Sequence, residues 1–354
     1  MGWGVCSASV GRDAAMSDAN MRISPTLHGA QSPHYAPHPN SGGAYRRLTA
    51  MRIALIHNPR AGNGHKPDLE QLLSLLRAHG HEVRYRSSKD GHLGNFLAGP
   101  ADVVVAAGGD GTIGKVAKLM RRHRTPIAAL PLGTANNICT SLGLTDLSLG
   151  EQIAGWATAP LLRFDIGKAS GPWGLRRFVE SFGIGVIPRM IGNGSQHPRH
   201  KAARHDRGLD LAIDHLERCP ATDLDASIDG RPCSGRFVLF EVMNIALVGP
   251  NLSLATSADP SDRCFDVVLV REFEREMFRE CLEAEANGLP WPHELTTIRG
   301  RSLEFAPGRF PVHLDDEVFL PHRDARQAHI RLAIREGVRL LVPEKNGARV
   351  ASVN

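Results

Sequence analysis

Residues 51 to 150 alternate short apolar strands with amphipathic helices, and this alternation constrains the fold more than any other feature of the chain. A strand is predicted over Ile53–Ile56, and the leucines after it have the spacing of one helix face: Leu69, Leu72, Leu73 and Leu76. Further strands are predicted over 83–85, 103–107 and 127–130. Because residues 103–107 are apolar on both faces, we expect an α/β domain whose parallel sheet is covered by helices on both sides.

After about residue 160 the pattern changes to short strands separated by turns. Strands are predicted over 178–181, 237–240, 265–268, 329–332 and 338–342. Asp229-Gly230 has the composition of a hairpin turn. One helix interrupts the strands, with a single apolar face formed by Leu209, Ala212, Ile213 and Leu216. These features predict a second domain that is mostly an antiparallel β-sandwich.

A chain of 354 residues is long enough for two domains. We place the first at 51–150 and the second at 151–332, and we expect residues 333–345 to be able to return to the first domain. Residues 1–50 are rich in Pro, Gly, Ser and Asn without an apolar period, so we expect a flexible leader. A translation start at Met51 is an equally good interpretation. Residues 346–354 are expected to form a flexible tail.

The charge and cysteine content narrow the class of protein only partly. A net charge of +5 suits anionic lipid headgroups, nucleotides or nucleic acid alike. The basic run Arg199–Arg207 could contact a lipid surface or could be a solvated face. The tryptophans Trp156, Trp173 and Trp291 are better explained by packing than by base stacking, so nucleic acid is disfavoured. Six cysteines without C-x-x-C spacing favour a reducing, cytoplasmic compartment.

The segment Gly108–Lys115 lies between a predicted strand and its helix, where backbone N–H groups favour phosphate binding. It contains a G-x-G-x-x-G string, but on the third strand of the domain and without the acid expected ~20 residues later. It also nearly matches a Walker A loop, but Val116 stands where a hydroxyl should hold magnesium. The segment therefore fits neither the G-x-G-x-x-G signature nor the Walker A signature.

A third interpretation combines Gly108-Gly109-Asp110-Gly111-Thr112 with a second glycine turn, Pro131–Asn137, after the next strand. Glycine turns at adjacent strand ends would line one crevice of a parallel sheet. Together with Asn58–Gly62 after the first strand, this pair resembles the diacylglycerol kinase-like lipid kinases, in a superfamily with sphingosine kinases and NAD kinases. The resemblance covers about residues 51 to 343 and implies the fold of that superfamily.

The resemblance implies an ATP site. Its lining would comprise the following positions: Asn58, Ser87, Gly108, Gly109, Asp110, Gly111, Thr112, Ile113, Gly114, Gly133, Thr134 and Asn136. Asn58 would support the phosphate end. Asp110 would be a catalytic residue that faces the phosphates through Mg²⁺ or a water and manages charge, and some related enzymes are thought to use this aspartate as the base. The family commonly follows its first glycine motif with an Asn-Glu pair, whereas this chain has Gly114-Lys115.

Phosphoryl transfer also needs a group that accepts the proton of the substrate hydroxyl. The segment His313–Glu317 resembles the family's D-G-E signature. The resemblance implies that Asp315 is the base and that Glu317 orients it. Asp316 replaces the expected glycine, and an exposed acidic turn is the alternative interpretation.

The segment Ala258–Asp266 resembles the family's acidic loop, which holds a structural magnesium ion. The ligands implied are the Asp262 side chain and the carbonyls of Asp259 and Cys264, completed by waters. Arg263 occupies a position that is usually glycine, so a salt-bridged loop without metal stays open.

The resemblance implies an ATP- and Mg²⁺-dependent phosphotransferase with an alcohol acceptor, acting on a diacylglycerol-like or sphingoid lipid in lipid metabolism and phospholipid biosynthesis. We expect a cytoplasmic protein in transient, peripheral contact with a membrane, and a homodimer stays open. No apolar stretch approaches the ~20 residues that span a bilayer. The alternatives are a kinase of a soluble hydroxyl compound such as NAD, and a catalytically silent protein that binds nucleotide or lipid.

Overall fold

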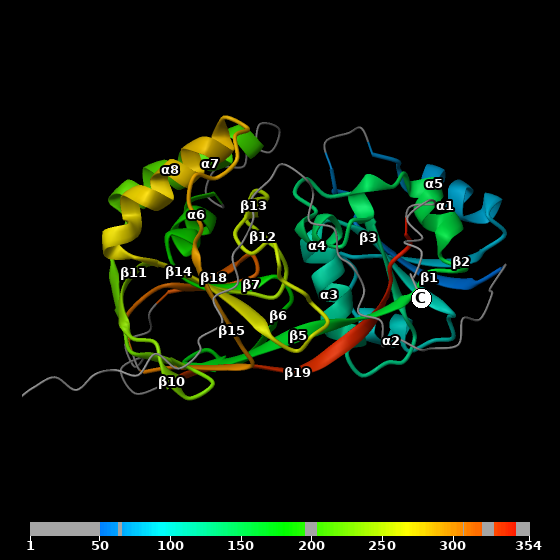
Figure 1. The fold of residues 1–354 in the computed structure, drawn as a ribbon. Coiled ribbons are helices and arrows are strands. Elements are labelled where there is room, and N and C mark those ends of the chain that lie inside the picture. The colour runs from blue at the N-terminus through cyan, green and yellow to red at the C-terminus, as the bar shows by residue number, and fades with distance from the viewer. Residues whose placement is uncertain (1–49, 63–65, 195–203, 307, 321–328, 345–354) are drawn as a thin grey trace, which may run out of the picture.

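Four parallel strands form the centre of the N-terminal domain in the computed structural model, which describes residues 50–62, 66–194, 204–306, 308–320 and 329–344 (Figure 1). Their order across the sheet is β2 (Glu82–Ser87), β1 (Arg52–His57), β3 (Val103–Gly108) and β4 (Ile127–Pro131). All three pairings are parallel. The strand ends that precede the glycine turns therefore lie at one edge of the sheet.

Helices cover both faces of this sheet, as the apolar strands require. Val103 and Val105 pack into one core cluster with Leu72 of a covering helix, whereas Val104 packs on the opposite face with Val116. The helices of this domain are α1 (Leu69–Ala78), α2 (Leu93–Leu97), α3 (Asp110–Met120), α4 (Asn137–Ser141), the 3₁₀ turn η1 (Leu144–Asp146) and α5 (Leu149–Gly155).

A long two-stranded ribbon joins the two domains. β5 (Leu161–Gly171) and β19 (Ile330–Leu341) pair antiparallel over most of their length. At one end, Leu340 and Leu341 of β19 pair in parallel with β4. At the other end, β19 pairs with β16 (Ser302–Phe305), which belongs to the second domain. One sheet therefore runs from the first domain into the second.

The second domain stacks this extension against a separate antiparallel sheet. The order of that sheet is β15 (Thr296–Gly300), β14 (Phe265–Arg271), β11 (Gly235–Met243), β7 (Ser181–Gly185), β17 (Val312–Leu314) and β18 (Glu317–Phe319). The remaining strands are β6 (Gly174–Phe178), β8 (Thr222–Leu224), β9 (Ala226–Ile228), β10 (Arg231–Pro232), β12 (Leu247–Val248) and β13 (Leu252–Ser253).

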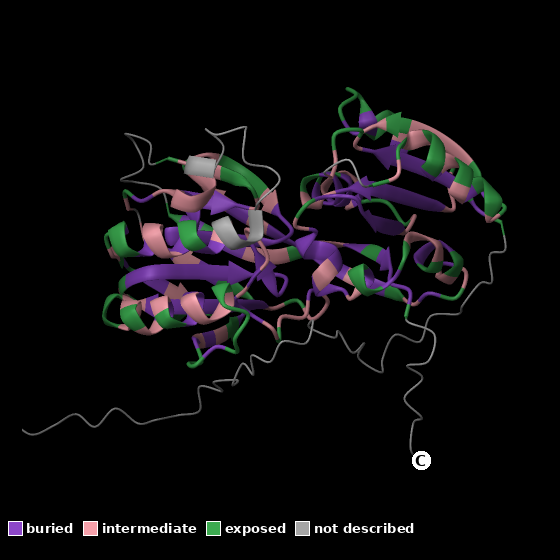
Figure 2. Ribbon diagram, turned by 90° about the horizontal axis from the view of Figure 1, so that it is seen from above, coloured by how far each residue is buried: buried purple, intermediate pink, exposed green. Residues whose placement is uncertain are grey.

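In the described part of the chain, three helices cover the other face of the antiparallel sheet. They are α6 (Val186–Gly194), α7 (Arg204–Arg218) and α8 (Arg275–Ala286), with the 3₁₀ turn η3 (Glu272–Glu274) before α8. Leu209, Leu216 and Phe278 of these helices pack in one cluster with Val268 of the sheet. Figure 2 shows the resulting layers, with buried strands inside and helices that are exposed on their outer sides.

Aromatic side chains hold the two sheets of the second domain together. The ring of Phe305, on β16, lies 5.1 Å from that of Phe240 and 5.7 Å from that of Phe182 on the opposite sheet. Phe178 and Phe265 make a second contact between the sheets at 5.5 Å. Such pairs add about 0.5–1.5 kcal/mol each beyond the burial of their area.

The predicted fold class, a parallel α/β domain followed by a mostly antiparallel domain, is confirmed. Asp229 and Gly230 do form a two-residue hairpin turn between β9 and β10, with φ of 49° and 77°. The prediction of one strand over 178–181 is wrong, because β6 ends at Phe178 and β7 begins at Ser181. The backbone amides of the two residues between them bind a side chain instead of a neighbouring strand.

The two strands predicted at 329–332 and 338–342 are a single strand, β19. The pairing register with β5 shifts between Ile334 and Glu336, so the alternation of apolar residues is interrupted there. The predicted leader and tail, and the side chains of the basic run before α7, fall outside the described residues. Among the residues that are described, no helix combines the length and apolar character needed to cross a membrane.

Replacing Phe305 with alanine should lower the free energy of unfolding by about 3–5 kcal/mol, because it removes the ring shared by both sheets. Denaturant unfolding monitored by circular dichroism measures the change. The matched control is Phe273→Ala, since Phe273 is 81% exposed and its loss should change stability by at most about 0.5 kcal/mol. Equal effects of the two substitutions would contradict this account of the core.

Candidate active site

The two glycine turns contact each other backbone to backbone. A Cβ added at Gly133 would lie 2.3 Å from Cα of Gly109, closer than real atoms approach. Asn136 takes a left-handed conformation (φ 57°) and closes the second turn. Its Oδ1 accepts a hydrogen bond from the Gly133 amide (2.8 Å), and its Nδ2 donates to the Gly133 carbonyl (3.1 Å). Glycine is therefore required here by packing.

Asp110 ties the same two turns together from the first residue of α3. Its carboxylate accepts a hydrogen bond from the Ile138 amide at the start of α4 (2.9 Å). Burial raises the pKa of Asp110, and the amide donors around the carboxylate oppose that rise. Asp110, the acid of the first glycine motif, thus caps α4, the helix that follows the second glycine turn.

The other predicted nucleotide-binding residues lie at the same edge of the sheet. Asn58 follows β1, and its side chain accepts a hydrogen bond from the Arg60 amide (3.1 Å). Ser87 ends β2, and its hydroxyl accepts from the Lys89 amide (3.1 Å). Thr134 is exposed in the turn after β4. Open parallel sheets bind ligands at this edge, and the assignment of these residues to ATP stays a prediction.

A cavity of about 280 Å³ opens between α3 and the turn that joins β17 to β18. The lining residues come from both domains and are mostly charged: Asp110, Gly111, Gly114, Lys115, Lys118, Leu119, Glu180, Asp315 and Asp316. The structure therefore brings Asp110 and Asp315 to one cavity, although they are far apart in the sequence.

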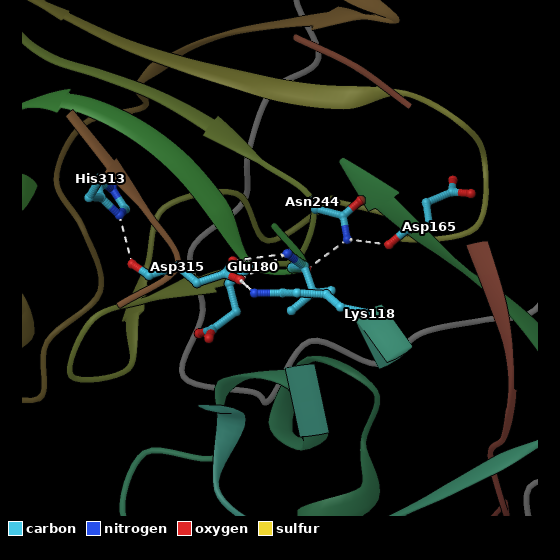
Figure 3. Close-up of polar contacts among 7 residues, drawn as sticks. Lys118, Asp165, Glu180, Asn244, His313 and Asp315 are labelled. Atoms are coloured by element: carbon cyan, nitrogen blue, oxygen red, sulfur yellow. Dashed lines mark hydrogen bonds and ion pairs between the residues drawn. The ribbon is translucent and has the colours of Figure 1, made fainter. Parts of the chain in front are cut away.

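Hydrogen bonds and an ion pair fix the position of Asp315 (Figure 3). Its backbone is left-handed, with φ of 52°, a conformation that Asp tolerates better than most residues. The carboxylate accepts hydrogen bonds from the amides of Val179 (2.9 Å) and Glu180 (2.8 Å), and Oδ2 pairs with Nζ of Lys118 at 2.7 Å. Its own amide donates to the Ser181 carbonyl (2.9 Å). The carboxylate is thus positioned before any ligand binds.

Asn244 fixes the backbone that presents those amides. Its Nδ2 donates to the carbonyls of Val179 (2.8 Å) and Asp165 (3.1 Å), and its side chain is buried. Figure 3 shows it between Asp165 and Glu180. The segment between β6 and β7 can therefore pass from one sheet to the other with its backbone groups hydrogen-bonded.

A buried pair of ionisable groups supports the turn from behind. His313 donates through Nδ1 to the carbonyl of Asp315 (2.8 Å) and through Nε2 to Oε1 of Glu241 (2.8 Å). Both side chains are 0% exposed. Burial by itself lowers the pKa of His313, but the charge and hydrogen bond of Glu241 outweigh it, so the pKa is raised. A Cβ on Gly183 would collide with Glu241, so this position requires glycine.

Comparisons with the sequences of known proteins show the family of this chain. Residues 52–169 match the family model of the diacylglycerol kinase catalytic domain. A probable lipid kinase, YegS-like, of Stenotrophomonas maltophilia (strain K279a) is 32% identical over 301 residues, which cover 76% of this chain and 91% of that protein. The chain belongs to the diacylglycerol kinase-like family of lipid kinases.

Two further proteins of this kind have a lower sequence identity to this chain. The diacylglycerol kinase of Bacillus subtilis (strain 168) is 24% identical over 235 residues, covering 62% of this chain and 74% of that protein. A solved structure of a putative diacylglycerol kinase from Bacillus anthracis str. Sterne superposes with a TM-score of 0.63 at 19% identity, covering 83% of this chain and 99% of the other. The latter likeness supports the fold.

Two charged residues that line the cavity, Glu180 and Lys118, were not identified as site residues from the sequence. Glu180 is buried, and its Oε2 accepts a hydrogen bond from Asn137 (3.2 Å). Burial, together with the nearby charges of Asp110 and Asp315, raises its pKa well above the usual range. The only signal in the sequence is an acid inside an apolar strand pattern. Lys118 reads as a solvated residue on α3, and only the tertiary fold brings it to Asp315.

Glu317, expected to orient Asp315 in this family, is exposed on β18 and does not line the cavity. Asp316, which replaces the family's glycine, does line it. The groups that contact the Asp315 carboxylate are Lys118 and the two amides described above. The orienting role of Glu317 stays a prediction.

The acidic loop expected to hold magnesium is neutralised by arginine in this structure. Arg299 pairs with Oδ2 of Asp262, and Oδ1 accepts from the Cys264 amide (2.7 Å). The Asp259 carboxylate accepts from the amide and hydroxyl of Ser261 (2.8 and 2.6 Å). No group of three or more His, Cys, Asp or Glu side chains suited to a metal occurs in the described part of the chain. The site at Asp259, Asp262 and Cys264 stays a prediction, and a metal there would have to displace Arg299.

The residue that replaces glycine in this loop also has a partner. Arg263 is left-handed (φ 64°), and its amide donates to Oδ2 of the buried Asp165 (2.7 Å). Arg163 pairs with the other oxygen of Asp165 at 2.7 Å. Burial raises the pKa of Asp165, and the charge of Arg163 opposes the rise. The loop is thus anchored to β5 by the hydrogen bond from the Arg263 amide to the Asp165 carboxylate.

The double substitution Glu241→Gln/His313→Gln should remove a pH-dependent contribution to stability. Because the folded-state pKa of His313 is raised above its unfolded value of about 6.5, its contribution is fully present below that pH. It is lost as the pH rises through the folded pKa. The wild-type chain should therefore lose its advantage over the double variant with rising pH, as measured by denaturant unfolding across a pH series.

The matched control is Glu280→Gln/His293→Gln, an exposed pair whose side chains are 46% and 40% accessible. Its removal should change stability by at most about 1 kcal/mol. A constant difference between wild type and the buried double variant at every pH would show that His313 does not titrate with folding.

Gly133→Ala should lower stability by about 1–3 kcal/mol, because the new Cβ forces the two glycine turns apart. Gly150→Ala is the control, since an added Cβ there meets nothing within 4 Å, and alanine should be neutral or stabilising by up to about 1 kcal/mol in a helix. Thermal unfolding compares them, and an unaffected Gly133→Ala variant would refute the close contact.

Proposed function

We propose that this chain is an ATP- and Mg²⁺-dependent kinase that phosphorylates the hydroxyl group of a diacylglycerol-like or sphingoid lipid. The observation that carries the proposal is the placement of Asp315, from the second domain, across one cavity from the glycine helix of the first. Phosphoryl transfer depends mainly on positioning and charge neutralisation, with a carboxylate to accept the hydroxyl proton. The family's lipid kinases support a lipid as the acceptor.

In this mechanism the amides at the start of α3 and of the second glycine turn would bind the triphosphate. Asp110 and the neighbouring cavity acids offer the oxygen ligands that Mg²⁺ prefers, and the bound ion would neutralise phosphate charge. Asp315 would accept the proton of the lipid hydroxyl as its oxygen attacks the γ-phosphorus. The fixed position of Asp315 favours this role, because its carboxylate need not reorganise during the reaction.

The localisation and partners follow from the substrate. A kinase that acts on a membrane lipid would contact the bilayer peripherally and transiently from the cytoplasm, and its product would enter phospholipid metabolism. We propose no role in nucleic-acid binding.

The direct test is transfer of radiolabel from γ-labelled ATP to lipid. The purified chain is incubated with mixed micelles that contain diacylglycerol, sphingoid base or ceramide, and the lipids are extracted and separated. Label in the organic phase supports the proposal. Label that appears only in a water-soluble product, such as phosphorylated NAD, would favour the soluble-substrate alternative. Nucleotide binding without any transfer would favour a silent homologue.

Asp315→Asn should lower kcat at least about 100-fold, because the carboxamide keeps the shape of the side chain but cannot accept the proton. Its affinity for ADP, measured by calorimetry, should stay close to that of the wild type. Asp146→Asn is the matched control, since Asp146 is exposed on η1 and does not line the cavity. An Asp315→Asn variant with near-normal turnover would remove Asp315 from the mechanism.

A further inference from the structure

Lys118 lies on the face of α3 that lines the cavity. Gly111, Gly114, Lys115 and Lys118 follow the i, i+3, i+4, i+7 spacing of one helix face, and all four line the cavity. Helical side chains point back toward the helix N-terminus, so the Lys118 side chain extends toward the glycine motif. The ammonium group is thereby carried to the end of the cavity where phosphates are expected.

Gly114 makes room for this arrangement. A Cβ at Gly114 would lie 2.9 Å from Cγ2 of Val179 and 3.9 Å from Cε of Lys118. Because the glycine has no side chain, α3 approaches the segment whose amides bind Asp315, and the lysine stem passes beside it. The glycine and the lysine therefore form one structural unit.

Lys118 pairs with the oxygen of Asp315 that would accept the proton of the substrate hydroxyl. Oδ1 accepts hydrogen bonds from two backbone amides, at 2.9 Å from Val179 and 2.8 Å from Glu180. Oδ2 has a longer contact with the Val179 amide (3.2 Å) and pairs with Nζ of Lys118 at 2.7 Å. The Asp315 side chain is 6% exposed and that of Lys118 is 33% exposed. The ammonium thus lies between the buried acid and the solvent-accessible cavity.

The charges that line the cavity give this ammonium a specific task. The acids are Asp110, Glu180, Asp315 and Asp316, and the cations are Lys115 and Lys118. Lys115 donates to the carbonyl of Ser88 at 2.7 Å. An ammonium has three N–H donors, so Lys118 can keep its bond to Asp315 and still offer donors to a phosphate. Without such a cation, a phosphate would bind poorly next to these acids because like charges repel.

We propose that Lys118 is a catalytic residue that bridges Asp315 and the γ-phosphoryl group of ATP during transfer, an inference that rests on the function proposed above. The lipid oxygen forms the new bond to the γ-phosphorus, and the bond from that phosphorus to the β,γ-bridging oxygen breaks. The electron pair of the broken bond leaves with ADP, and the hydroxyl proton passes to Asp315. Lys118 stays protonated throughout and neutralises charge on the moving phosphoryl oxygens.

The bridging role predicts selectivity for nucleotides that carry a γ-phosphate. Lys118→Met keeps the length of the side chain but removes its charge. This variant should bind a non-hydrolysable ATP analogue with Mg²⁺ at least about tenfold more weakly than the wild type, because a charge-assisted hydrogen bond is lost. Its affinity for ADP with Mg²⁺ should hardly change. Lys118→Arg keeps the positive charge and should restore most of the preference for the analogue.

Isothermal titration calorimetry measures both affinities, and Arg122→Met is the matched control. Arg122 is exposed on the turn after α3 and does not line the cavity. If Lys118→Met keeps the preference of the wild type, or loses affinity for both nucleotides equally, the bridging role is wrong. Lys118 would then only neutralise Asp315 in the folded protein.

A measurement on the wild-type chain covers the case in which the variants do not fold. Lysines are acetylated with a water-soluble reagent, and modification of Lys118 is quantified by mass spectrometry. The ATP analogue with Mg²⁺ should protect Lys118 severalfold more than ADP with Mg²⁺ does. Equal protection by both nucleotides overturns the inference. Because neither readout requires turnover, a chain that transfers no phosphate to lipid would refute the proposed function without deciding the position of Lys118.

Discussion

The ion pair between Lys118 and Asp315 joins a helix of the first domain to a hairpin turn of the second, and the geometry of the site depends on it. Lys118 lies on α3, the helix that begins in the first glycine motif. Asp315 lies in the turn between β17 and β18 of the other domain. Its carboxylate is further bound by backbone amides, and His313 binds the carbonyl of the same residue. The relative placement of the two domains therefore also sets the geometry of the active site.

The sequence allowed the fold class to be predicted because its signals were local. The apolar strands, the helix faces and the Asp229-Gly230 turn each depend on neighbours a few residues away. The errors occurred where distant contacts decide the conformation. Strand pairing stops at Val179 because its amide binds Asp315, which lies 136 residues later. β19 could not be recognised as one strand, since the register shift near Glu336 interrupts the periodicity.

The same distinction applies to the candidate site. The glycine turns, Asp110 and Asp315 were found because they lie in short motifs with characteristic composition. Lys118, Glu180 and Glu241 carry no such motif, and nothing local separates them from surface residues or from chance polar residues in strands. His313 begins the segment that resembles the D-G-E signature, but nothing local shows that it pairs with Glu241. Their significance comes from burial and from partners on other elements. The acidic loop is intermediate, because its composition was visible but its distant partners Asp165 and Arg299 were not.

The ribbon of β5 and β19 has a consequence for how the chain can be divided. β19 is the last strand described, yet it lies next to β4 of the first domain and next to β16 of the second. A fragment truncated after the first domain would expose the edge of β4, and an unpaired edge strand invites aggregation. During biosynthesis the N-terminal sheet would thus remain incomplete until β19 has left the ribosome.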